Sequence, residues 1–203
     1  MFAAIGTIVV PILIHLLAAN IIVVLFGARL DSTMLTTLTA LVVLPVVYWM
    51  YRVDTGGWEK SKKKWWTYLL LIPLGVIANL TVSYVLILSR VPEHFSNEVQ
   101  EGLLSSGPLA QVIGLGVMAP LMEEILFRGL VYRRLKSYMP RWAAVLLGAG
   151  IFAVYHGNMM QILFAFPMAL LIIWSYERWG TLTAPVLFHM AANLSTIFQN
   201  IIG

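Results

Sequence analysis

The sequence predicts an all-α, polytopic transmembrane helix bundle with about seven spans. Of its 203 residues, 60% are hydrophobic and only 11% are charged, and the mean hydropathy is +0.87. A soluble domain averages about 25% charged residues. No strand pattern stands out, and a lipid-exposed chain must satisfy its backbone polar groups internally, which favours helices. We expect a single transmembrane domain over residues 1–203.

Seven apolar segments follow one another, at about 20 residues per membrane-spanning helix. The first contains Pro11, which predicts a kink, and it lacks a basic leader, so we interpret it as a retained span rather than a signal peptide. Gly56-Gly57 and Gly157-Asn158 predict breaks between helices. The segments cover residues 2–26, 33–51, 66–88, 109–131, 142–156, 159–176 and 181–201.

Basic residues predict the orientation of the bundle. With the connections assigned to alternate sides, 11 of the 13 lysines and arginines fall on one side. The positive-inside rule makes that side, and the N-terminus, cytoplasmic. The formal charge of +4 therefore indicates topology and contact with anionic lipid, and no nucleic-acid partner. The 11 residues are Arg52, Lys60, Lys62, Lys63, Lys64, Arg128, Arg133, Arg134, Lys136, Arg141 and Arg178, whereas Arg29 and Arg90 lie opposite.

The fourth segment contains charged residues, which are rare in apolar spans and indicate a function or a structural pairing. Glu123, Glu124 and Arg128 lie within six residues, and a lone charge near the bilayer centre costs about 3 kcal/mol on insertion scales. On a helix, Glu124 and Arg128 are four residues apart and can pair. Glu123 points about 100° away. The pattern predicts one carboxylate held by its own arginine and a second that faces a cavity.

Three further polar residues lie in the later segments. His156 ends the fifth segment, and His189 and Asn193 lie four apart, hence on one face, in the seventh. A carboxylate can take a proton from water while a histidine positions that water. An asparagine amide, with or without a histidine, can stabilise an oxyanion. The set predicts hydrolysis, most simply of a peptide bond.

The same residues leave other functions open. Glu123, His156 and His189 could ligate Zn²⁺, although the HExxH motif of many zinc proteases is missing. The chain has no cysteine, which excludes disulfides and a cysteine nucleophile. A non-catalytic binding or immunity protein could use the same polar cluster. A proton-coupled transporter is a further alternative, but no internal repeat supports it.

Three motifs resemble those of a known family. Glu123-Glu124-Ile-Leu-Phe-Arg128 matches EExxxR, Phe152-Ala-Val-Tyr-His156 matches FxxxH, and His189-Met-Ala-Ala-Asn193 matches HxxxN. In this order they resemble the CPBP intramembrane proteases, which include CAAX prenyl endopeptidases and bacteriocin-processing enzymes and are also called the Abi family. The motif-bearing region covers about residues 118–193.

The resemblance implies a role for each motif residue. Glu123 would be the general base that activates water, and His156 would help to hold that water. His189 and Asn193 would form the oxyanion site. Glu124 and Arg128 would support this geometry, and Phe152 would pack beside it. A metal-independent glutamic mechanism is favoured over a zinc one.

The substrate implied is a membrane-associated peptide or protein, including a prenylated CAAX protein. We expect a water-accessible cavity that opens laterally or to the cytoplasm. The short chain favours a prokaryotic cell membrane. The sequence does not indicate an oligomeric state.

Overall fold

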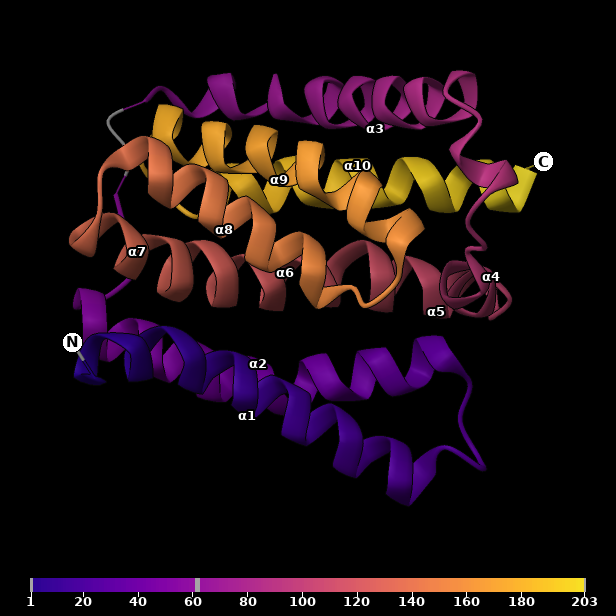
Figure 1. Cartoon of the computed structure of the whole chain (residues 1–203), viewed down its shortest axis with the longest axis horizontal. Coiled ribbons are helices and arrows are strands. Elements are labelled where there is room, and N and C mark those ends of the chain that lie inside the picture. Colours follow the sequence, from indigo (N-terminus) through magenta and orange to yellow (C-terminus); the bar gives the residue numbers. More distant parts are fainter. Residues whose placement is uncertain (1, 61–62, 203) are drawn as a thin grey trace.

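A computed structural model describes residues 2–60 and 63–202, and these residues form an all-helical bundle, which confirms the predicted fold class (Figure 1). The helices are α1 (Phe2–Phe26), α2 (Ser32–Thr55), η1 (Trp65–Tyr68), α3 (Leu71–Leu88), η2 (Val91–Glu93), α4 (Glu98–Leu104), α5 (Pro108–Ala110), η3 (Gln111–Met118), α6 (Ala119–Glu124), η4 (Ile125–Tyr132), α7 (Arg133–Tyr138), α8 (Arg141–Tyr155), α9 (Met159–Trp179) and α10 (Thr183–Ile202).

The elements from α5 to α7 run on without a break as one long helix over residues 108–138. By length and composition, five helical stretches of the described chain could cross a membrane. They are α1, α2, η1 with α3, the long helix, and α9. α8 has only 15 residues, and polar side chains interrupt α10. The predicted count of about seven spans is therefore not confirmed.

Local sequence explains where several helices begin and end. The carboxylate of Asp31 accepts the backbone N–H of Met34 at 2.8 Å and caps α2. This bond to the ionised form lowers the pKa of Asp31. Gly56 ends α2 with φ +76°, a left-handed conformation that glycine adopts without strain. Asn158 caps α9 by accepting the N–H of Gln161 at 2.9 Å. The predicted breaks at Gly56 and at Gly157-Asn158 are thus confirmed.

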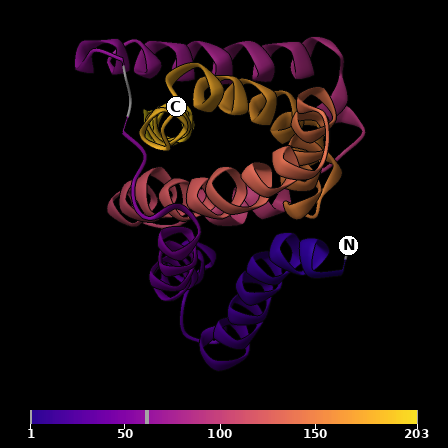
Figure 2. The same ribbon diagram turned by 90° about the vertical axis from the view of Figure 1, so that its left-hand side faces the viewer.

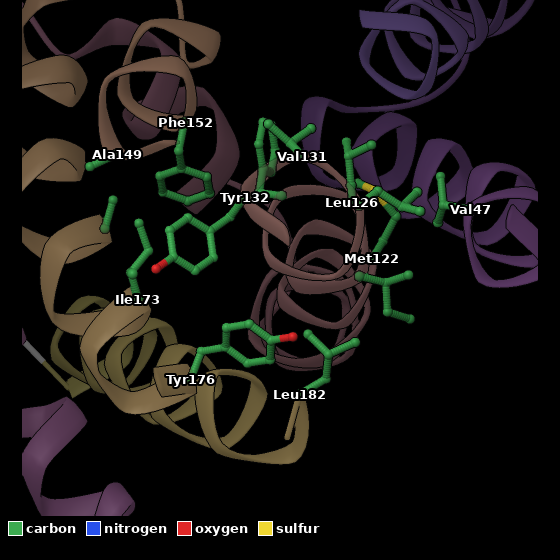
Figure 3. Packing of buried hydrophobic residues seen from close by; sticks show 14 of the residues in the cluster. Val47, Met122, Leu126, Val131, Tyr132, Ala149, Phe152, Ile173, Tyr176 and Leu182 are labelled. Atoms are coloured by element: carbon green, nitrogen blue, oxygen red, sulfur yellow. The ribbon is translucent and has the colours of Figure 1, made fainter. Parts of the chain in front are cut away.

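The long helix lies at the centre of the packing. On one side it contacts α1 and α2, and on the other it contacts α8 and α10 (Figure 2). Figure 3 shows its side chains Met122, Leu126 and Tyr132 among buried residues of the neighbouring helices. These partners include Val47 of α2 and Ile173 of α9. The helix that bears the glutamates is therefore covered by apolar side chains over much of its surface.

α10 packs closely against α3 because a glycine lies at their contact. A Cβ added to Gly75 of α3 would lie 2.4 Å from the carbonyl oxygen of Phe188, and 3.1 Å from the Ala191 side chain. Small residues allow helix backbones in membranes to approach in this way. Phe188 directly precedes His189, so this contact also sets the position of a motif residue.

We predict that Gly75→Val destabilises the protein and displaces His189. The added side chain must push α10 away, and overpacking of this kind costs about 1–3 kcal/mol. Gly150→Val in α8 is the control, because nothing lies within 4 Å of a Cβ at that position. Thermal unfolding in detergent measures both variants, and an equal effect would contradict the role of Gly75.

Candidate active site

The two adjacent glutamates lie on a short α-helical stretch between two π-helical stretches of the long helix. α6 holds both carboxylates, with η3 before it and η4 after it. Ala119 donates its backbone N–H to Gly114, five residues earlier, which is the π pattern. Pro120 follows at once, and a proline has no N–H and crowds the carbonyl four residues before it. The wider π turn before Pro120 relieves this crowding, so the π-helical stretch is consistent with the proline.

Glu124 and Arg128 form the buried pair that their spacing predicts. Arg128 Nη1 lies 3.0 Å from Glu124 Oε1, and the two side chains are 1% and 0% exposed. The guanidinium also lies 4.2 Å from the ring centre of Phe152 on α8, a favourable cation–π contact. Charge compensation and ring stacking together allow two ions to remain inside the bundle.

His189 lies between the two glutamates. Its Nδ1 is 2.7 Å from Glu124 Oε1, and its Nε2 is 3.9 Å from Glu123 Oε2. Because an ionised carboxylate can only accept, the short contact assigns a hydrogen to Nδ1. The ring is thereby fixed with Nε2 directed toward Glu123. Glu124 thus holds the Nδ1 side of the His189 ring, and Glu123 lies on the Nε2 side.

Glu123 faces a cavity of about 560 Å³, as the angle between the glutamates predicts. The other catalytic candidates also line this cavity, and they are His156, His189 and Asn193. Phe152 lies at its wall, with its ring centre 4.9 Å from that of His156 and 5.9 Å from that of His189. The structure thus brings the polar residues of the three motifs to one space.

His156 and Asn193 are each held by a backbone carbonyl. His156 Nδ1 lies 2.9 Å from the carbonyl oxygen of Phe152, so Nδ1 carries a hydrogen and Nε2 is left for other partners. Asn193 Nδ2 donates to the carbonyl of Leu115 at 3.0 Å. In the π pattern Leu115 would accept from residue 120, but Pro120 has no N–H to give. Asn193 satisfies that carbonyl and keeps a second amide hydrogen.

The alternative zinc ligand set is not assembled in this arrangement. Among the described residues no group of three His, Cys, Asp or Glu side chains is placed to hold a metal ion. Each histidine donates from Nδ1 to a protein oxygen, that of Phe152 for His156 and that of Glu124 for His189, and keeps Nε2 open. Metal-ligating histidines share this arrangement, so it does not distinguish the two mechanisms. Because Glu123, His156 and His189 are not assembled as a ligand group, we derive no step through a metal.

Sequence reasoning missed several neighbours of the site. Tyr155 precedes His156, and its hydroxyl lies 2.6 Å from His15 Nδ1 of α1, so a polar contact joins α1 to the helix that carries His156. The cavity is also lined by uncharged polar side chains, among them Asn79 and Ser83 of α3. Only the position of Tyr155 within the FxxxH motif could have indicated such a role.

We predict that Arg128→Met destabilises the protein by about 3–5 kcal/mol, because it leaves the Glu124 carboxylate buried and unpaired. Arg134→Met is the matched control, since Arg134 pairs with Asp54 where both side chains are partly exposed, and such pairs contribute about 0–1 kcal/mol. The double change Glu124→Gln, Arg128→Met should recover much of the loss. Equal unfolding temperatures for the two methionine variants would contradict the prediction.

Comparison with known proteins gives one match. Residues 105–195 match the family model described as type II CAAX prenyl endopeptidase Rce1-like. No curated protein and no solved structure matches the chain. The matched segment holds all three motifs and begins before the long helix. The segment that carries Glu123, His156 and His189 is therefore similar to the Rce1-like type II CAAX prenyl endopeptidases, in agreement with the resemblance of the motifs, and the chain around it has several helices that could cross a membrane.

Proposed function

We propose that this chain is an intramembrane endopeptidase that hydrolyses a peptide bond of a membrane-associated peptide or protein. The observation that carries the proposal is the position of Glu123. Its side chain faces a cavity inside the bundle, whereas its neighbour Glu124 is paired with Arg128. The family match supports a CAAX-type endopeptidase, so prenylated proteins are among the candidate substrates.

In the proposed reaction Glu123 is the general base. It takes a proton from a water held with the help of His156, and the oxygen of that water bonds to the scissile carbonyl carbon. The resulting oxyanion is stabilised by His189 Nε2–H and by the second amide hydrogen of Asn193. The carbon–nitrogen bond then breaks, and Glu123 returns the proton to the leaving amine. Water is consumed, and one carboxyl group and one amine form.

The charges of the cluster fit this reaction. His189 can donate from Nε2 only as an imidazolium, because its Nδ1 hydrogen is bound to Glu124. With Glu123 and Glu124 ionised and Arg128 and His189 cationic, the four charges sum to zero. A neutral sum is the least costly one in an apolar interior.

No metal is required by this mechanism. The proton acceptor, the oxyanion donors and the groups that orient them are all side chains of the chain itself. The alternative is a non-catalytic protein that uses the same cluster to bind a peptide. Such a protein would bind the peptide without cleaving it, whether or not Glu123 is present.

We predict that Glu123→Gln abolishes cleavage of a fluorogenic membrane-peptide library while the fold is retained. Gln has nearly the same size but cannot act as a base, and general-base catalysis contributes about 10²–10⁴ in rate. Glu93→Gln is the control, because Glu93 is exposed and pairs with Arg90. The wild type should keep its activity with a zinc chelator. Activity lost on chelation would refute the metal-independent mechanism, and binding without cleavage would favour the non-catalytic alternative.

We also predict that Asn193→Leu lowers kcat by about 10²–10³ with little change in KM, since loss of one oxyanion donor has this effect. Pro120→Ala should lower kcat less, because it supplies a backbone N–H that competes with Asn193 for the Leu115 carbonyl. Leu146→Ala, which truncates an exposed side chain of α8, is the control. A change in KM alone would contradict an oxyanion role for Asn193.

A further inference from the structure

The two ends of the bundle differ in charge. The end at which α2 and α9 finish and α8 begins, here called the basic end, carries most lysines and arginines (Figure 1). Arg128 is not among them, because it is buried beside Glu124, and this corrects its assignment to a connection. Lys62 lies outside the described residues. The basic end still has Arg52, Lys60, Lys63, Lys64, Arg133, Arg134, Lys136, Arg141 and Arg178.

The other end, here called the α4 end, includes the 27–31 connection, the 89–107 connection and the α8–α9 turn. Its described basic residues are Arg29 and Arg90, against four acidic residues, Asp31, Glu93, Glu98 and Glu101. Under the positive-inside rule the basic end is cytoplasmic, so the α4 end is extracytoplasmic.

The cavity lies in the half of the bundle next to the α4 end. Its lining extends from Glu123, in the middle of the long helix, and His189, in the second turn of α10, to Pro92, Asn97 and Gln100 in the 89–107 connection. In Figure 1 the segment that joins α3 to α5, which includes α4, lies at the opposite end of the bundle from α7. The cavity therefore runs from the catalytic candidates toward the α4 end.

The length of α8 explains why the bundle is hollow on this side. Its 15 residues span about 22 Å at 1.5 Å per residue, which is less than the roughly 30 Å of a hydrocarbon core. α8 starts at the basic end, so His156 and the turn after it lie below the opposite membrane surface. Non-helical backbone at such depth is tolerated where it is buried in protein or lines a water-filled space.

We propose that the catalytic cavity opens to the extracytoplasmic face, and that its substrate is an extracytoplasmic segment of a membrane-associated peptide or protein. This rests on the proposed function. It differs from the expectation drawn from the sequence, which was a cavity that opens laterally or to the cytoplasm.

The chemistry of the cavity indicates the kind of segment that it takes. Among its described lining residues Glu123 is the only carboxylate, and no lysine or arginine is present. Asn79, Ser83, Asn97 and Gln100 offer uncharged donors and acceptors, which suit the backbone of an extended peptide. Glu98 and Glu101 of α4 are exposed, and they are next in sequence to the lining residues Asn97 and Gln100. An acidic rim attracts cations and repels anions, so an uncharged or basic segment is preferred.

Because the chain has no cysteine, single cysteines can report the exposed side. We would introduce Glu101→Cys on α4, Ser83→Cys in the cavity and Lys60→Cys at the basic end. Intact cells are treated with a small, membrane-impermeant thiosulfonate that carries a trimethylammonium group. We expect modification of the first two cysteines in intact cells, and of Lys60→Cys only after lysis.

Modification of Lys60→Cys but not Glu101→Cys in intact cells would overturn the orientation. Ser83→Cys that reacts only after lysis, or not at all, would overturn the open cavity. The same pattern is expected in a Glu123→Gln background, because labelling requires no proteolysis. Failure of the orientation is thereby distinguished from failure of the proposed activity.

A second comparison tests the rim. Ser83→Cys should react faster with the cationic thiosulfonate than with an anionic one, and Glu98→Gln, Glu101→Gln should reduce that difference. Equal rates for the two reagents before the double change would overturn the charge preference.

Discussion

The buried pair of Glu124 and Arg128 is the interaction on which the rest of the site depends. Arg128 compensates a carboxylate that could not otherwise stay ionised inside the bundle. That carboxylate then fixes His189 of α10, and the guanidinium stacks on Phe152 of α8. One ion pair thus joins the three helices that carry the motifs. Glu123, adjacent in sequence, is left to the cavity because its direction differs from that of Glu124.

A second constraint comes from backbone hydrogen bonding in the apolar interior. Pro120 removes a donor from the long helix, and Asn193 supplies one to the carbonyl of Leu115. The α8–α9 turn, where Gly157 adopts φ +80°, is a further non-helical stretch and lies between the cavity-lining residues His156 and Met160. Both irregular places lie near the cavity. This agrees with the general finding that non-helical backbone in membranes is confined to protein interiors and polar cavities.

Helix positions and the motif residues were predictable from the sequence, because hydropathy and four-residue spacing act locally. The pairing of Glu124 with Arg128 follows from spacing alone. The bond from Asn193 to Leu115 could not be predicted, since it joins two helices through a π turn that no local pattern indicates. The burial of Arg128 was also misassigned in the charge count, because its position next to the basic run of the following connection resembles a topology signal. The number of spans was not predictable from apolar segments alone. It also depends on the length of each helix, such as the 15 residues of α8, and on the polar residues within a helix, such as those of α10.

The two ends of the bundle are held together by different forces. At the basic end, ion pairs join separate helices, with Arg134 bound to Asp54 and both Lys136 and Arg141 bound to Glu177.

At the α4 end, neutral hydrogen bonds converge on the last turn of α4. Gln111 and Asn200 both donate to the carbonyl of Leu104, at 2.8 and 3.0 Å, and Thr33 donates to that of Leu103. A neutral hydrogen bond contributes about 0.5–1.5 kcal/mol, and a partly exposed ion pair about 0–1 kcal/mol. Neither end is therefore held much more strongly than the other by its polar contacts. The two ends differ instead in charge, because the ion pairs of the basic end join side chains of opposite sign, whereas the bonds at the last turn of α4 join uncharged groups.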